Sequence, residues 1–102
     1  MRLRRRSFGD LVDTQLELFA GDQRQLLADC EAALLAYDDA SGEDAEERYG
    51  EYVDLVDEAR DELELVRDGY AASLDEGTAD AYRVAFNDSA RRRFSRYLLE
   101  LE

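Results

Sequence analysis

The residues able to do chemistry are few and scattered. The sequence has no His and a single cysteine, Cys30, so it offers no Ser–His or Cys–His pair and no Glu-x-x-His di-iron motif. Cys30 lies among apolar residues at helical spacing, where a thiol is usually an inert core residue. Acid–base catalysis by paired carboxylates needs a pocket that raises one pKa. Pairs such as Asp57/Asp61 and Glu58/Glu62 fall on a predicted solvent face, so we predict no enzyme activity and no catalytic residue.

Metal and cofactor sites are equally poorly supported. The sequence has no Asp-x-Asp-x-Asp-Gly loop for calcium, and its six glycines are too scattered for a phosphate-binding loop. The acidic run at residues 43–47 is the composition that a helix dipole favours in a first turn. We predict no metal site, no cofactor and no small-molecule substrate.

All 13 basic residues are Arg, against 26 Asp and Glu, which gives a net charge of −13. Such a surface repels nucleic-acid phosphates on average. Two Arg clusters nevertheless resemble a nucleic-acid footprint, and their candidate contact residues are Arg4, Arg5, Arg6, Arg92 and Arg96. The competing interpretation for the second cluster is pairing within the chain, of Arg92 with Asp61 and of Arg96 with Asp57, which we favour.

Helix-start signals divide the chain into three helices. Ser7 followed by Asp10 and Ser41 followed by Asp44 resemble capping boxes, and Thr78 is a third N-cap after a Gly-containing break. These signals predict helices at residues 8–39, 42–74 and 78–100. Gly21-Asp22 is the place where the first helix could divide in two.

Hydrophobic periodicity predicts how these helices pack. The first two helices carry apolar seams with alternating spacings of four and three residues, which is a heptad pattern. The first seam is Val12, Leu16, Phe19, Gln23, Leu26, Cys30, Ala33 and Tyr37, and the second is Ala45, Tyr49, Tyr52, Val56, Ala59, Leu63, Val66 and Tyr70. Folding the second helix back around Ser41 places Leu26 opposite Val56, Phe19 opposite Leu63 and Tyr37 opposite Ala45. Only Gln23 interrupts the pattern.

The third predicted helix has an aromatic face that includes Tyr82, Phe86, Phe94 and Tyr97. Folded back, it brings Tyr82 to Tyr70 and ends near the level of Tyr52. We therefore predict an all-α fold in which a long antiparallel hairpin and a shorter third helix form an up-down-up three-helix bundle. Residues 1–7 form a basic N-terminal arm, and residues 8–102 form the helical domain.

Because the third helix is short, the hairpin tip should project beyond it by a distance on the order of 15 Å. We expect apolar residues there, with a second stripe on the first helix, to form an interface. The candidate interface residues are Leu11, Leu18, Leu34, Tyr37, Tyr49 and Tyr52. The predicted function is a non-enzymatic helical interaction or structural module, with a homodimer or another protein as partner. Two alternatives are a nucleic-acid-associated accessory protein and a small-molecule or metal sensor with a site between helices.

The cell compartment is predicted from three features. A single cysteine cannot form an internal disulfide and fits a reducing compartment. The basic residues at the N-terminus are not followed by the apolar segment of a signal peptide. The longest apolar run, residues 32–37, is far too short to span a membrane. We expect a cytoplasmic protein without membrane association.

Overall fold

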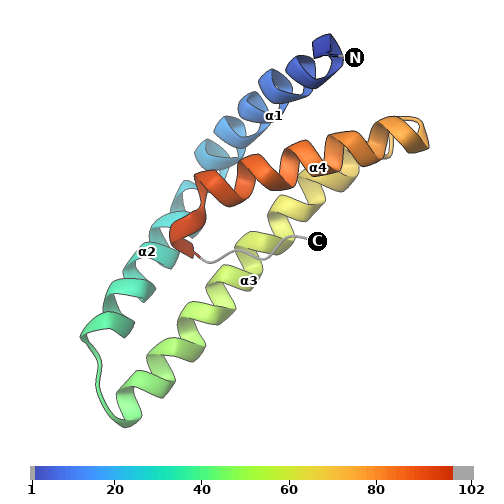
Figure 1. The fold of residues 1–102 in the computed structure, drawn as a ribbon. Helices are drawn as coiled ribbons and strands as arrows, with labels where there is room; N and C mark the ends of the chain where they lie inside the picture. The colour runs from blue at the N-terminus through green and yellow to red at the C-terminus, as the bar shows by residue number, and fades with distance from the viewer. Residues whose placement is uncertain (1, 98–102) are drawn as a thin grey trace.

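A computed structural model describes the backbone of residues 2–97 and the side chains of residues 8–97. This part of the chain contains four α-helices, one 3₁₀ turn and no strand, which confirms the all-α prediction (Figure 1). The elements are α1 (Arg2–Asp22), α2 (Arg24–Asp39), α3 (Glu43–Ala71), α4 (Glu76–Arg93) and the 3₁₀ turn η1 (Ser95–Tyr97). Because α1 begins at Arg2, helical backbone starts before the residue 8 predicted from the sequence.

The long first helix of the prediction is two helices separated at Gln23. This residue has φ −105° and ψ 27°, outside the helical values. The hydrogen bonds from the Gln23 N–H to the Phe19 carbonyl (2.8 Å) and from the Leu27 N–H to the Gln23 carbonyl (2.9 Å) are kept. The chain therefore bends without forming a loop. The bend falls beside the predicted Gly21-Asp22 position, at the polar residue that interrupts the heptad seam, and it gives four helices where three were predicted.

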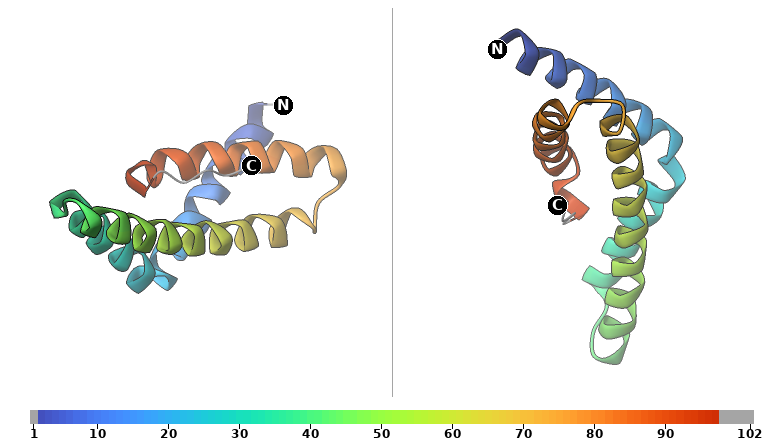
Figure 2. Two further views of the ribbon diagram at one scale, coloured as in Figure 1. Left: turned by 90° about the horizontal axis from the view of Figure 1, so that it is seen from below. Right: turned by 90° about the vertical axis from the view of Figure 1, so that its right-hand side faces the viewer.

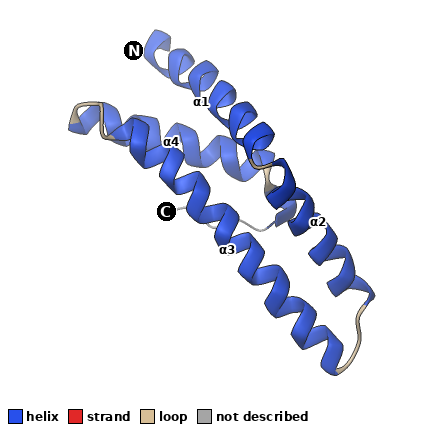
Figure 3. Ribbon diagram, turned by 180° about the vertical axis from the view of Figure 1, so that it is seen from behind, coloured by secondary structure: helices blue, strands red, loops and turns tan. Residues whose placement is uncertain are grey.

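This bend sets the arrangement of the other helices. The helices α2 and α3 form an antiparallel hairpin, whereas α1 diverges from α3 and leaves an angle that α4 occupies (Figures 1 and 3). Viewed from the side, α4 lies next to the upper half of α3, and the hairpin of α2 and α3 continues beyond it (Figure 2). The molecule is elongated, with extents of 52 × 21 × 20 Å. The three-helix up-down-up bundle is therefore replaced by a hairpin with a splayed first helix and an inserted fourth.

Aromatic side chains fill the angle between α1 and α3. The Tyr82 ring lies 4.9 Å from Tyr70, 5.8 Å from Phe8 and 6.0 Å from Phe86, measured between centroids. Its hydroxyl donates to Gln15 Oε1 at 2.7 Å, so this buried polar atom has a partner. The contact between Tyr82 and Tyr70 confirms the predicted fold-back of the last helix.

Phe19 makes a contact with the last helix that the prediction did not include. Its ring packs edge-to-face on Phe94 of α4 at 5.8 Å and is 4% exposed. In the predicted hairpin, Phe19 lies against Leu63 of α3. At the far end of the hairpin, the Tyr37 ring packs on Tyr49 with 5.2 Å between the ring centroids. Most of the predicted heptad positions are buried or half-buried, whereas Tyr49 is exposed, and α4 supplies part of the packing.

The helix starts differ in detail from the capping signals. The N-cap of α3 is Gly42, at φ 60°, a backbone conformation that glycine adopts without the steric cost of a Cβ. The N-cap of α4 is Asp75, whose carboxylate accepts from the Thr78 N–H at 2.9 Å. Ser41 and Thr78 are therefore not the N-caps, although each lies within a turn of the true one.

The packing of Phe19 can be tested by truncation. We expect Phe19→Ala to lower the free energy of unfolding by about 3–5 kcal/mol, because it removes a buried ring and leaves a cavity beneath Phe94. Urea denaturation followed by circular dichroism measures the change. Leu65→Ala is the control, because Leu65 is 67% exposed and its loss should cost little. A loss at Phe19 no larger than at Leu65 would contradict the observed packing.

Candidate interaction surfaces

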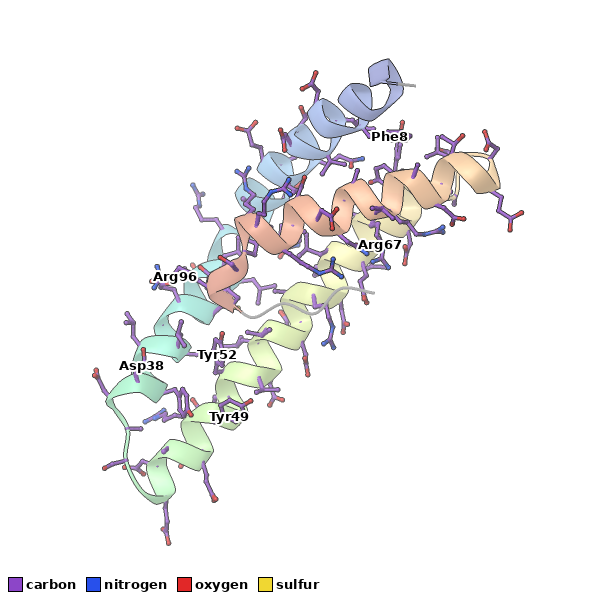
Figure 4. All side chains as sticks on the ribbon, in the orientation of Figure 1. Phe8, Asp38, Tyr49, Tyr52, Arg67 and Arg96 are labelled. Carbon is purple, nitrogen blue, oxygen red and sulfur yellow. The ribbon has the colours of Figure 1, made fainter. Side chains whose placement is uncertain are left out.

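The layer formed by α4 and η1 ends at Tyr52. The Tyr52 hydroxyl donates to the Arg96 carbonyl at 3.4 Å, and Tyr52 is 3% exposed. The Arg96 guanidinium pairs with Glu31 of α2 at 2.8 Å. These contacts attach η1 to the middle of the hairpin (Figure 4). The predicted exposure of Tyr52 is therefore wrong, because η1 covers this residue.

Beyond this level, the tip consists of α2 and α3 alone within the described chain. Tyr49 is 50% exposed and stacks on the partly buried Tyr37, and Leu34 is also partly buried. We call Leu34, Tyr37 and Tyr49 the aromatic tip. The first turn of α3, at the same end of the hairpin, contains three acidic residues, Glu43, Asp44 and Glu46. The tip thus combines a half-exposed aromatic pair with strong negative charge.

A second exposed region lies where α1 leaves α3. Leu18 is 63% exposed, whereas Leu11, predicted beside it, is partly buried against the core. Next to Leu18 is a cleft of about 220 Å³ between the two helices. Its lining residues are Gln15, Leu18, Phe19, Asp22, Gln23, Glu62 and Val66. Sequence reasoning identified Leu18 but missed the cleft, because a continuous hairpin would close it.

The second Arg cluster is engaged within the chain. Arg96 pairs with Glu31 rather than with the predicted Asp57, and Arg92 donates to the Ser89 hydroxyl at 3.1 Å. Arg91 pairs with Asp88 at 3.5 Å. Residues 91–93 form the last turn of α4, where positive charge interacts favourably with the helix dipole. The side chains of Arg4, Arg5 and Arg6 lie outside the described residues.

A buried cation ties α3 to α4. Arg67 is 6% exposed, and its Nη1 donates to Asn87 Oδ1 at 3.0 Å while its Nε donates to Asp68 Oδ1 at 2.8 Å. The Asp68 carboxylate also lies 3.7 Å from Arg83. The bond from Arg67 is the main cause that lowers the pKa of Asp68. Sequence reasoning missed this cluster, because Asn87 of α4 meets Arg67 only in the folded chain.

The one thiol is poorly suited to chemistry. Cys30 is fully buried, and its burial, with the nearby Asp29 and Glu58 charges, raises its pKa to about 11. It is protonated at neutral pH, whereas the thiolate is the nucleophilic form. Among the described residues, no group of three or more His, Cys, Asp or Glu could hold a metal ion. No helix in the same part of the chain is both long and apolar enough to cross a membrane.

Comparisons with known proteins give no family for the chain. No protein-family model matches it, and no similar curated protein or solved structure was found. Its function is therefore argued from its own residues.

Burial of Cys30 predicts slow thiol chemistry. We expect the native protein to react with a disulfide reagent at pH 8 at least ~100-fold more slowly than the urea-unfolded chain, because both burial and the raised pKa suppress the thiolate. Absorbance of the released thiol measures both rates. Equal rates in the two states would show that Cys30 is accessible.

The bond between Arg67 and Asp68 predicts a dependence of stability on pH. Because the folded pKa of Asp68 is lowered, its contribution is present above the unfolded pKa and is lost as the pH falls below about 4. We expect wild type to exceed Asp68→Asn in free energy of unfolding at neutral pH, with the difference shrinking on acidification. Asp68 is half exposed, so the effect is small. Urea titrations across this pH range measure it.

The control is Asp54→Asn on the exposed surface of α3, which removes the same charge away from Arg67. A difference between wild type and Asp68→Asn that stays constant with pH would contradict the assigned ion pair.

Proposed function

We propose that the chain is a non-enzymatic helical protein–protein interaction module that self-associates through its aromatic tip. The observation that carries the proposal is that, within the described residues, the layer of α4 and η1 reaches Tyr52 and leaves Tyr37 and Tyr49 on a two-helix tip. Aromatic residues are enriched in protein interfaces, and Tyr supplies apolar area together with a hydroxyl that tolerates water.

A second copy suits this surface geometrically. Two antiparallel hairpins that meet face to face form a four-helix arrangement, and a two-fold axis lets the same patch serve both partners. The tip would then gain from its own partner the layer that α4 supplies elsewhere. The acidic first turn of α3 opposes this association, since two copies combine −26 of charge from −13 each. Screening by salt should therefore strengthen the dimer.

The non-enzymatic part of the proposal is supported by the absence of His from the sequence and by the protonated, buried Cys30. The same buried thiol is compatible with a reducing compartment, and we place the module in the cytoplasm. Arg92 and Arg96 each have a partner within the chain, Ser89 and Glu31, which supports pairing within the chain over nucleic acid as their partner.

Self-association is tested by sedimentation equilibrium at about 50 mM and about 500 mM NaCl. We expect a dimer at tens of micromolar protein that tightens at the higher salt, and we expect Tyr49→Glu to dissociate it while helicity is kept. Val84→Glu is the matched control, because Val84 is 61% exposed on α4 and receives the same charge.

A monomer under both salt conditions would contradict the proposed self-association. A dimer that survives Tyr49→Glu but dissociates with Leu18→Glu would contradict the tip as its location.

A further inference from the structure

The cleft between α1 and α3 combines an apolar floor with a negatively charged rim. Phe19 is buried and Val66 is half-buried, so both helices contribute apolar atoms to its interior. Leu18 stands at its edge with 63% of its surface exposed. Asp22 and Glu62 add one carboxylate from each helix. Gln15 and Gln23 complete the lining, which contains no cation.

This combination of groups selects a cationic, partly apolar occupant. A Lys or Arg side chain lays its aliphatic stem on apolar surface while its charged head stays near solvent or a carboxylate. In the cleft, the stem would cover Phe19 and Val66, and the head would reach Asp22 or Glu62. A neighbouring Leu of the same occupant could pack on Leu18.

The size of the cleft argues for side chains of a protein rather than for a free small molecule. Its volume of about 220 Å³ is below the range of roughly 300–1,000 Å³ typical of small-molecule pockets. It suits one or two side chains projecting from a helix. Such grooves commonly bind amphipathic helices through residues spaced three or four apart.

We propose that this cleft docks a basic amphipathic helix of a partner protein, which presents Leu beside Lys or Arg at i, i+4 spacing. The net charge of −13 attracts a basic partner and repels a second acidic copy, and the carboxylates of the rim give the attraction a defined position. The cleft involves none of the aromatic-tip residues, so this proposal does not depend on self-association.

The probe is a synthetic 18-residue helix of Leu and Lys in an amphipathic pattern, labelled for fluorescence anisotropy. The matched peptide carries Glu in place of Lys. We expect the Leu–Lys peptide to bind wild type and the Leu–Glu peptide to show no binding. We expect Leu18→Ser to weaken binding about tenfold, and the double variant Asp22→Asn/Glu62→Gln to do the same at low salt. Circular dichroism checks that each variant is folded.

The control separates the cleft from general charge attraction. The double variant Asp54→Asn/Asp88→Asn removes two carboxylates from α3 and α4 outside the cleft, and it should change affinity by less than about twofold. Equal weakening by the two double variants, or unchanged affinity with Leu18→Ser, would overturn the proposal.

Two further measurements separate this proposal from the proposed function. Tyr49→Glu should bind the Leu–Lys peptide as wild type does, whether or not it dissociates a dimer. If Leu18→Ser instead dissociates a homodimer and the peptide competes with that dimer, the cleft belongs to a second copy and the proposal is wrong.

Discussion

The bend at Gln23, between α1 and α2, directs α1 away from α3 and is the constraint on which the rest of the fold depends. A continuous heptad seam would keep the first helix against α3 along its whole length. Gln23 places a polar side chain in that seam, and the backbone bends there while keeping its hydrogen bonds. Bending moves the apolar face of α1 away from α3, and α4 fills the angle with aromatic rings. Phe19 is buried there, with its ring against Phe94 of α4.

Insertion of α4 has an electrostatic consequence as well as a packing one. It covers Arg67, and a buried guanidinium is stable only where hydrogen-bond acceptors surround it. Asn87 on α4 and Asp68 on α3 supply those acceptors. Removing one member of such a cluster costs more than its presence contributes, so the cluster fixes how α3 and α4 meet. The aromatic rings bury apolar surface between the helices, whereas the bond from Arg67 to Asn87 links one position on α3 to one position on α4.

Both candidate interaction surfaces lie where α4 does not cover α3. The helix α4 begins at the far end of α3 and ends at Arg93, and within the described residues η1 extends its layer to Tyr52. The aromatic tip lies beyond that layer. The cleft lies near the vertex of the angle between α1 and α3, and residues of both helices line it. A module with two such surfaces can join copies of itself at one and a basic partner at the other, which is the arrangement we propose.

The sequence by itself determined the helical class, the buried faces and the fold-back of the last helix. Apolar spacing identified the core positions Val12, Leu16, Leu63 and Phe86, all of which are buried. It also brought Tyr82 to Tyr70.

Only the tertiary structure decided which helix covers each face. Periodicity shows that a face is buried but not what buries it, and a seam on α1 is satisfied equally well by α3 or by α4. The stack of Phe19 on Phe94, the burial of Arg67 and the cleft all result from that choice. The choice rests on how whole helices share a limited apolar surface, and no local pattern of residues records it.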